Sequence, residues 1–522
     1  MRTRHSMPVT SLALGIVLLG GPSGCIDEGG LYPEQPAWDQ GNDIALGFLG
    51  YSDATLKTPT CWSCHSGSQM GWQETAHASA WETLQNSGHA AAYCEPCHTV
   101  GSLGNVSNSP GAGFAATPDP RYHDVQCESC HGPGLPHVSN PSAIIPRASF
   151  EAGVDVGNGC GECHEGSHHP FVEQWSQSAH GIGPNTAYAS GISESCKACH
   201  EGQTAMEVTF GETADYLEKG DGELRTITCV VCHDPHGSPY EAQLRASVDV
   251  PTEDHLCMRC HAREANPWSS RGPHAAQGPL LFGEDIGYIP SGFSFPDQEL
   301  RNNHGPRNNP RLCTTCHVSK LTITDAGGEF LLQSVGHTFE AASCTDEDGL
   351  PIPNGECPPK DKTFAGCTGS GCHGSESGAR NAYVKIRNRL NVLLDELWAD
   401  TDGDRVLEET DGGVLPQVIV AGFESDLDPT DGTMNPAKGA MWNAMLAWTE
   451  DRPQWSDAEV AGGSFSSHPN SGNGVHNPHL LEALLLASIG EVRNHYGLPV
   501  GVAPEDGPPL PGDFMAPEGG GI

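Results

Sequence analysis

Cysteine and histidine recur along the chain in a single pattern, Cys-x-x-Cys-His. It occurs eight times, at residues 61–65, 94–98, 127–131, 160–164, 196–200, 229–233, 257–261 and 313–317. Two thiols at this spacing can add to the two vinyl groups of one porphyrin, and the adjacent imidazole can bind the iron from one face of the ring. The pattern therefore predicts covalent attachment of c-type haem at each position.

A ninth motif, CTGSGCH at residues 367–373, has four residues between its cysteines. A spacer of this length still closes a loop onto a porphyrin edge, so we expect nine haems. The expected thioether cysteines are Cys61, Cys64, Cys94, Cys97, Cys127, Cys130, Cys160, Cys163, Cys196, Cys199, Cys229, Cys232, Cys257, Cys260, Cys313, Cys316, Cys367 and Cys372. The expected proximal iron ligands are His65, His98, His131, His164, His200, His233, His261, His317 and His373.

Two other chemistries use paired cysteines. A Cys-x-x-Cys pair can be half of a zinc site, or part of a disulfide framework in an oxidising compartment. Neither requires a histidine directly after every pair, so the sequence favours haem. Outside the motifs, Cys344 and Cys357 share a short Pro- and Gly-bearing loop, which predicts a disulfide in an exported protein.

The second axial ligand of each iron is expected from the remaining histidines. Two histidines on one iron leave no open position, so such a haem passes electrons without binding substrate. Five candidates in favourable local settings are His77, His137, His180, His236 and His476. Five further candidates in loops that could close over a ring are His89, His123, His274, His304 and His337. The methionines are interpreted as packing residues.

The composition predicts a loop-rich chain without an ordinary core. Of 522 residues, 65 are Gly and 41 are Pro, so long regular elements are scarce. We expect mostly irregular loops with short α-helices and little β structure, in which haems form the core. The formal net charge of -40 excludes nucleic acid as a partner, because the chain repels phosphate backbones.

The first 24 residues have the order of a bacterial lipoprotein signal. Basic residues are followed by an apolar stretch at 12–19, then small residues and Cys25. We expect lipidation of Cys25 to attach the protein to the membrane. The alternative is that Cys25 is an unpaired cysteine near the start of a soluble mature protein. The apolar stretch is too short to cross a bilayer, and no later stretch is long enough. Ile26 favours an outer-membrane lipoprotein facing the periplasm or the cell surface.

Motif spacing divides the rest of the chain. The first six motifs start 33, 33, 33, 36 and 33 residues apart, which indicates an internal repeat. The expected segments are a signal peptide (1–24), a tether (25–60), a seven-haem array (61–275), two further haems with the disulfide (276–378), a helical region with an acidic insert (379–499) and a Pro/Gly-rich tail (500–522). Apolar spacing predicts helices at 380–398, at 436–449, and from a cap at Asn477 to Gly497.

The acidic insert contains a candidate calcium loop. Asp400, Asp402, Asp404 and Asp411 occupy positions 1, 3, 5 and 12 of DTDGDRVLEETD, the oxygen spacing of such loops. Arg405 stands where the usual turn glycine would be. A solvated acidic loop without metal is the alternative.

Local sequences around the motifs resemble a known family. VQCESCHGPGLPH at 125–137, preceded by YCEPCHTVG at 93–101, is similar to the paired motifs of the multihaem family that includes hydroxylamine oxidoreductase and its tetrahaem electron acceptor. The resemblance implies closely spaced haem pairs, and implies that His137 serves a neighbouring haem. Multihaem nitrite reductases replace the histidine of the active motif with lysine, whereas every motif here keeps histidine.

These observations favour an exported nonahaem cytochrome that passes electrons between bis-His haems, in respiratory or extracellular electron transfer. No catalytic residue is nominated. The alternative is a haem-dependent oxidoreductase with one open haem that acts on small nitrogen or sulfur compounds. A third interpretation is self-association into a haem filament. The expected partners are redox proteins or extracellular electron acceptors, with basic or cationic ones favoured by the negative charge.

Overall fold

The computed structural model describes residues 47–499 with interruptions. The interruptions are 108–110, 153–157, 167–168, 183–192, 264–266, 268–270, 284–285, 295–303, 325–326, 370, 457–458, 461–462, 465 and 469–472. The expected signal segment, Cys25, much of the tether and the tail lie outside the described residues.

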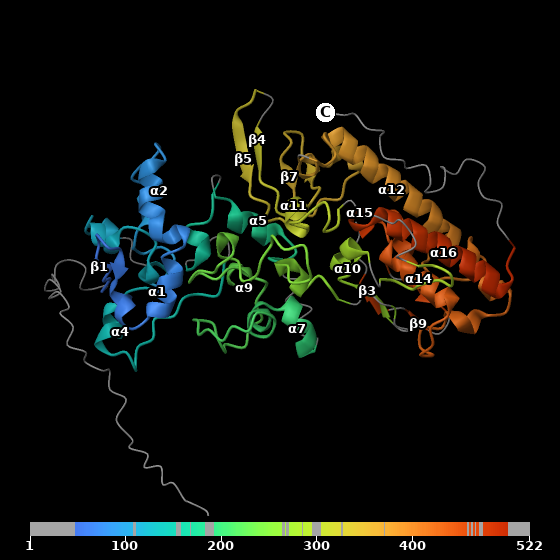
Figure 1. The fold of residues 1–522 in the computed structure, drawn as a ribbon, viewed down its shortest axis with the longest axis horizontal. Coiled ribbons are helices and arrows are strands. Elements are labelled where there is room, and N and C mark those ends of the chain that lie inside the picture. Colours follow the sequence, from blue (N-terminus) through green and yellow to red (C-terminus); the bar gives the residue numbers. More distant parts are fainter. Residues whose placement is uncertain are drawn as a thin grey trace, which may run out of the picture. The chain divides into compact units, whose positions relative to one another are not determined.

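Short helices separated by long connections make up most of the described chain (Figure 1). The α-helices are α1 (Ser66–Trp72), α2 (Ala80–Asn86), α3 (Cys127–His131), α4 (Leu135–Ser139), α5 (Phe171–Gln177), α7 (Glu194–His200), α8 (Gly202–Thr204), α9 (Cys229–Cys232), α10 (Gln277–Phe282), α11 (Cys313–His317), α12 (Glu376–Leu397), α13 (Val414–Val420), α14 (Pro436–Leu446), α15 (Asn473–His476) and α16 (Pro478–Tyr496). This is the loop-rich, helical architecture expected from the glycine and proline content.

Strands are short and occur only in pairs within the described residues. They are β1 (Tyr51–Asp53), β2 (Thr58–Pro59), β3 (Arg271–His274), β4 (Leu321–Thr324), β5 (Phe330–Ser334), β6 (Cys344–Thr345), β7 (Pro351–Ile352), β8 (Glu459–Val460), β9 (Gly463–Ser464) and β10 (Ser466–His468). The hairpin of β4 and β5 pairs Leu321 with Ser334 and projects from the motif-bearing region (Figure 1). Strands β3 and β10 pair in parallel across a long sequence separation.

The motif-bearing region has no large apolar core among its described residues. Its buried hydrophobic side chains form small separate clusters, such as Phe48, Val100 and Tyr122 in one and Ala152, Val172 and Trp175 in another. Clusters of this size bury little apolar area, so protein packing alone cannot offset the entropy of ordering these long loops. This agrees with the expectation that porphyrins supply the missing core.

The C-terminal helices form a protein core of their own. Helices α12, α13, α14 and α16 pack together (Figure 1), around side chains that include Trp398, Trp442 and Trp455, which are fully buried. Helix α14 is buried on all sides, and most of its residues are apolar. The prediction that haems form the core therefore applies to the region before this bundle, because the bundle buries its own apolar residues.

The three predicted helices are confirmed with small shifts at their ends. Helix α16 begins as expected after Asn477, whose side chain accepts a hydrogen bond from the Leu480 amide. It ends at Gly497, which has the left-handed φ of 64° that a glycine C-cap adopts readily. Helix α12 starts earlier than predicted because Ser375 caps it. None of the helices within the described residues is both long and apolar enough to span a membrane.

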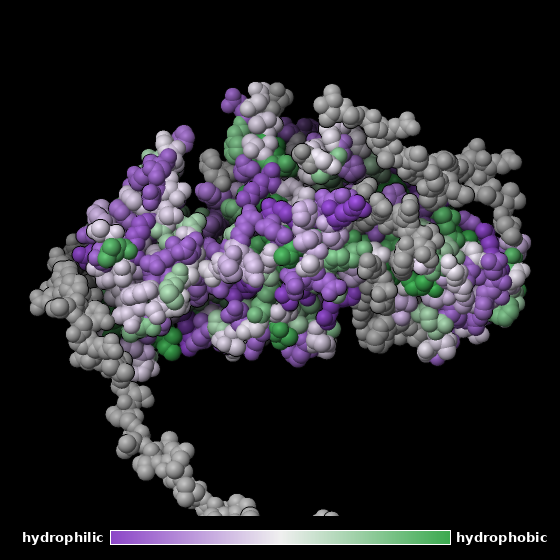
Figure 2. All heavy atoms as spheres, in the orientation of Figure 1, coloured by the Kyte–Doolittle hydropathy of each residue, from purple (hydrophilic) through white to green (hydrophobic). Residues whose placement is uncertain are grey.

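Polar side chains dominate the face of the molecule that Figure 2 shows. Figure 2 shows hydrophilic residues over most of the visible face, with apolar residues scattered among them. This distribution fits the excess of 66 acidic over 26 basic residues.

Candidate haem-binding sites

Each Cys-x-x-Cys-His motif forms one helical turn. In site 1, the motif at 61–65, the His65 amide donates to the Cys61 carbonyl over 2.9 Å. The same bond joins His233 to Cys229 and His261 to Cys257, at 2.9 Å each. Residues three and four apart lie on one side of such a turn, so the two thiols and the imidazole face the same way. We number the motifs as sites 1 to 9 in chain order.

The wider ninth motif closes in a related way. The His373 amide donates to the Cys367 carbonyl over 3.2 Å, and the Cys372 amide donates to the Gly369 carbonyl over 2.9 Å. The extra residues are therefore taken up inside the loop, and His373 still lies next to both cysteines. This geometry fits haem attachment through a four-residue spacer.

The cysteines divide into two groups. Cys344 and Cys357 are joined by a disulfide, with Cα atoms 6.0 Å apart. The eighteen motif cysteines are not joined by disulfides. Paired thiols that stay available are what thioether formation requires.

Eight of the nine motif histidines face a second histidine. The ring centres are 6.1 Å apart for His65 and His137, 6.1 Å for His77 and His164, 6.1 Å for His131 and His236, 6.2 Å for His180 and His261, 5.8 Å for His200 and His274, 6.4 Å for His233 and His337, 5.9 Å for His304 and His373, and 6.3 Å for His317 and His476. Every second histidine in these pairs is one of the ten distal candidates.

This spacing fits an iron between the two rings. A metal–imidazole bond is about 2 Å long and the ring centre lies about 1 Å beyond the nitrogen, so two rings on one ion have centres about 6 Å apart. Ordinary stacking would bring the rings closer, as it does for His123 and Trp81 at 4.0 Å. The residues present therefore fit haems with two axial histidines.

Backbone carbonyls hold several of these imidazoles by Nδ1. His131 bonds the Pro146 carbonyl at 2.9 Å, His233 bonds that of Ala242 at 2.7 Å, and His317 bonds that of Phe339 at 2.7 Å. A carbonyl can only accept, so Nδ1 carries the proton and Nε2 keeps a free lone pair. This arrangement fixes the tautomer and orients a metal-binding imidazole.

Burial favours the neutral form of several paired imidazoles. It lowers the pKa of His164 and His180 to about 4, and that of His476 to about 3. Neighbouring imidazoles lower these pKa values further. A neutral imidazole is the form that binds iron.

Site 2 differs from the other eight. His98 bonds the Ala80 carbonyl by Nδ1 at 2.8 Å, as a proximal ligand would. No other imidazole makes a ring contact with His98 among the residues that the structure describes. The candidate His123 instead stacks on Trp81, and the candidate His89 lies exposed after α2. The structure thus brings neither candidate opposite a motif histidine.

Contacts between cysteines of different motifs give an order of sites. Thiols of two different motifs shift each other's pKa between sites 1 and 3, 2 and 4, 4 and 6, 5 and 7, and 7 and 8, so these motifs lie close together. The thiols of Cys130 and Cys160 also interact, as do those of Cys232 and Cys257, and those of Cys316 and Cys367. The sites therefore follow the order 1–3–4–6–7–8–9, with site 2 beside site 4 and site 5 beside site 7.

A four-cysteine zinc site is not present among the described residues. The one group there that combines thiols with an imidazole is His255, Cys257 and Cys313, and its two cysteines belong to the contacting motifs of sites 7 and 8. The His255 Nδ1 accepts from the Cys257 amide, and its Nε2 lies 3.1 Å from the Arg311 carbonyl. His255 therefore helps to order the loop between the two motifs.

The acidic loop brings together three of its four candidate calcium ligands. Carboxylate oxygens of Asp400, Asp402 and Asp411 lie within 4.8 Å of one another, and Asp404 is not part of the group. Asp404 instead accepts from the Val406 amide at 2.8 Å. Arg405 lies in the turn of this loop and has a φ of 64°. Calcium loops normally have glycine at a position with this conformation.

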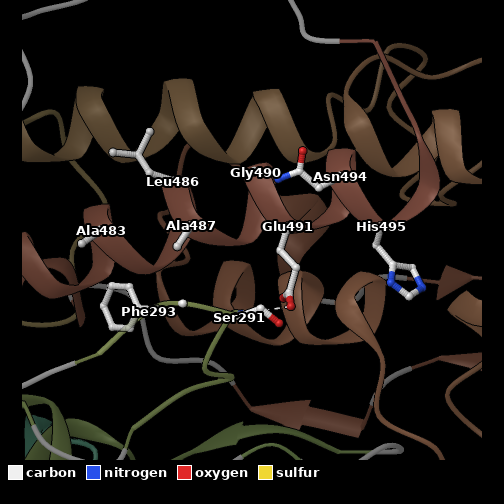
Figure 3. Close-up of a pocket in the computed structure, with 10 residues that line it drawn as sticks. Ser291, Phe293, Ala483, Leu486, Ala487, Gly490, Glu491, Asn494 and His495 are labelled. Carbon is white, nitrogen blue, oxygen red and sulfur yellow. Dashed lines mark hydrogen bonds between the residues drawn. The ribbon is translucent and has the colours of Figure 1, made fainter.

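A groove of about 700 Å³ lies along α16, away from the motifs (Figure 3). Phe293, Leu486 and Ala487 give it an apolar floor, and the Ser291 amide donates to Glu491 over 2.9 Å at its edge. None of the predicted haem ligands lines it.

Family models match two parts of the chain. The model described as "Cytochrome c554 and c-prime" matches residues 60–132, and the model described as "Doubled CXXCH motif" matches residues 222–266. Both matched segments contain motifs whose histidines lie in the pairs described above.

Curated relatives are of the same kind. The chain is 27% identical to "Multiheme cytochrome MtrA" of Shewanella baltica over 161 residues, 27% of this chain and 44% of the relative. It is 24% identical to "C-type polyheme cytochrome OmcB" of Geobacter sulfurreducens over 252 residues, 44% of this chain and 28% of the relative. It is 33% identical to "Cytochrome c-554" of Nitrosomonas europaea over 85 residues, 14% of this chain and 36% of the relative. The chain is a multihaem c-type cytochrome.

This cytochrome spans less than half the length of each of these relatives. No solved structure matches it. The family resemblance implies that His137 serves a neighbouring haem, and in the structure His137 lies opposite His65 of site 1, although it follows the motif of site 3. Sequence reasoning missed the residues that hold the pairs in place, such as Gln174, because a buried glutamine carries no haem-specific signal.

Gln174 shows how distant segments build one site. It is buried on α5, and its Oε1 accepts from the amides of Val335 at 3.1 Å and His337 at 3.2 Å. Its Nε2 donates to the Gln333 carbonyl over 3.3 Å. One side chain thus fixes the segment that carries His337 against the helix beside site 4.

Proposed function

We propose that this cytochrome carries electrons through nine covalently bound haems, eight of which have two axial histidines. The eight histidine pairs with ring centres about 6 Å apart are the observation that supports this function most directly. Bound haem supplies reversible one-electron chemistry. The protein supplies the ligands, the burial and the spacing.

The residues around each site suit electron carriage rather than substrate binding. An imidazole on both sides leaves no open position for a substrate. Carbonyls on Nδ1, such as that of Phe339 for His317, limit rotation of the ligands. Contacts between neighbouring motifs then arrange the sites in a continuous series from site 1 to site 9, with side branches at sites 2 and 5.

The nine attachments can be tested by mass spectrometry of peptides from the full-length holo-protein. We expect a haem adduct on every motif peptide, including the one that contains Cys367 and Cys372. A Cys367→Ala, Cys372→Ala variant should lose one haem and keep eight. Free thiols or zinc in place of haem adducts would contradict the proposal.

A second function, haem-dependent turnover of a small nitrogen or sulfur compound, is favoured by one observation only. His98 at site 2 has no facing imidazole among the described residues, so this site would be the open one. Carbon monoxide binding to the reduced protein should then amount to one haem per chain, and should be unchanged in His89→Ala and His123→Ala variants. Turnover of hydroxylamine or nitrite by a protein with one carbon monoxide-binding haem per chain would support an enzyme. Carbon monoxide binding without turnover would support electron transfer as the function.

We further propose export and anchoring through Cys25. The charge and apolar order of residues 1–24 supports a lipoprotein signal. A Cys25→Ser variant of the full chain should move from the membrane fraction to the soluble exported fraction with its haem content intact. An unchanged membrane fraction would contradict lipid anchoring.

The proposed redox partners are basic proteins or cationic acceptors. With a net charge of -40, the protein should attract them at long range, so electron transfer should slow as salt is added. A rate that rises with ionic strength would indicate an anionic partner instead.

We also propose that Asp400, Asp402 and Asp411 bind calcium. Their oxygens already converge within 4.8 Å, and hard oxygen ligands suit this ion. Calcium should raise the melting temperature of the holo-protein, and an Asp400→Asn, Asp411→Asn variant should lose that response. A calcium response that the variant retains would place the ion elsewhere.

A further inference from the structure

One residue contacts ligands of three neighbouring sites. The Phe339 ring meets the ring of His180, a site 7 ligand, edge-on with centres 4.7 Å apart. It also contacts the ring of His337, a site 6 ligand, at 5.5 Å. The Phe339 carbonyl accepts from Nδ1 of His317, the proximal histidine of site 8, at 2.7 Å.

The backbone at Phe339 is held in an unusual conformation. Its φ is 56°, in the left-handed region that side chains rarely occupy. The preceding turn is closed by a 3.3 Å bond from the Phe339 amide to the Gly336 carbonyl. A side chain on Gly336 would meet the Val318 backbone at about 2.5 Å, so only glycine fits there. The turn therefore directs the ring and the carbonyl of Phe339 to different sites.

Packing from other segments fixes the ring. Phe339 packs against the cluster that contains Val172 and Trp175, and Cys160 and Cys229 of sites 4 and 6 pack against the same cluster. Gln174 on the same helix accepts from the amides of Val335, just before this turn, and of His337, within it. These contacts come from segments about 160 residues apart, so the position is determined by the tertiary structure.

We propose that Phe339 is a positioning residue at the junction of sites 6, 7 and 8, where its ring sets the orientation of His180 and His337 and its carbonyl sets that of His317. The inference rests on the proposed histidine ligation of these sites. It adds that an aromatic residue outside the motifs, Phe339, links the ligands of three sites in the central part of the electron route, although Phe171 also contacts His337, with ring centres 5.1 Å apart.

Ligand-plane angles make the effect observable. The planes of His180 and His261 are 72° apart, the widest angle of the eight pairs, whereas those of His233 and His337 are 19° apart. Electron paramagnetic resonance of oxidised bis-His haem responds to this angle. Site 7 should therefore give the most anisotropic signal, distinct from that of site 6.

The test compares Phe339→Leu with wild type and with Phe48→Leu in the full-length holo-protein. Leucine keeps apolar volume and the carbonyl at position 339 but removes the ring. We expect two haem signals to shift: the most anisotropic signal, from site 7, and a signal from near-parallel ligand planes, from site 6. The signal of site 8 should stay unchanged. Phe339→Tyr, which retains the ring, should restore both signals. Phe48 is fully buried in a cluster without motif residues, so Phe48→Leu should lower stability without moving any signal.

The outcomes separate this inference from the proposed function. A wild-type spectrum without bis-His signals would overturn the proposed function. If the wild-type protein gives bis-His signals and Phe339→Leu leaves them unchanged, the positioning role of Phe339 is overturned and the proposed function is not. If Phe339→Leu does not fold, Phe339→Met provides the same comparison; failure of both to fold while Phe48→Leu folds would show a packing role and contradict the proposal.

Discussion

The histidine pairs are the smallest unit on which this cytochrome depends. In site 8, His317 comes from a motif helix, while His476 comes from α15, more than 150 residues later, and the ring centres lie 6.3 Å apart. In the proposed ligation, the motif alone therefore specifies half of the iron environment. The other half depends on how distant segments pack.

At this scale we predict that His476→Ala opens site 8. The variant should bind one more carbon monoxide per chain than wild type after reduction, because removal of one axial imidazole leaves a free position on the iron. Gas titration followed by absorption spectroscopy measures this number. His495→Ala is the control, since His495 lies on α16 beside the groove and faces none of the motif histidines in the described structure. Equal gas binding by His476→Ala and wild type would argue against the pair.

Elements outside the motifs hold these ligands in place. Asn477 is fully buried at the start of α16; it caps the helix, and its Nδ2 donates to the Leu280 carbonyl on α10 over 3.0 Å. Because His476 is the adjacent residue, this cap anchors both the C-terminal core and one proposed ligand of site 8.

We predict that Asn477→Ala lowers the free energy of unfolding by about 1–3 kcal/mol, through loss of the cap and an unsatisfied buried carbonyl. Denaturation of the holo-protein followed by circular dichroism measures this loss. Asn494→Ala, on the same helix at the groove, should change stability little. Equal effects of the two substitutions would contradict the anchoring role.

The disulfide stabilises the segment between sites 8 and 9. Cys344 and Cys357 enclose a loop with a sequence separation of 13, so their replacement by serine should cost up to about 3 kcal/mol, through the greater freedom of the unfolded chain. Chemical denaturation with and without a reductant measures this cost. No change on reduction of the wild-type protein would show that the bond contributes little.

At the scale of the molecule, two kinds of core meet in one chain. The C-terminal helices enclose three fully buried tryptophans, whereas the motif-bearing region has only small clusters of apolar residues among its described parts. Protein without haem should therefore lose structure unevenly, because only the helical core buries enough apolar area to persist.

Hydrogen exchange of the chain produced without haem attachment tests this difference. Amides of α12, α14 and α16 should stay protected, while those of residues 47–275 should exchange as in an unfolded chain. Uniform protection, or uniform loss, would contradict a division into haem-dependent and protein-only cores.

Sequence predicted the parts of this structure that are encoded locally. The motifs, the cap at Asn477 and the helix from Pro478 to Tyr496 each depend on neighbouring residues, and the structure has them close to where they were expected. Eight of ten distal candidates face a motif histidine, but the pairing, such as His77 with His164, could not be read from spacing, because it depends on long-range packing. The contacts of Gln174 and Phe339 were missed for the same reason.

The most direct test of the account is near-infrared magnetic circular dichroism of the oxidised full-length holo-protein, with iron measured on the same sample. Axial ligand types give separate bands in this spectrum. The structure predicts nine irons per chain, eight with bis-histidine bands and one with a different band from site 2. Fewer than eight bis-histidine haems, or bands of methionine ligation at the paired sites, would contradict it.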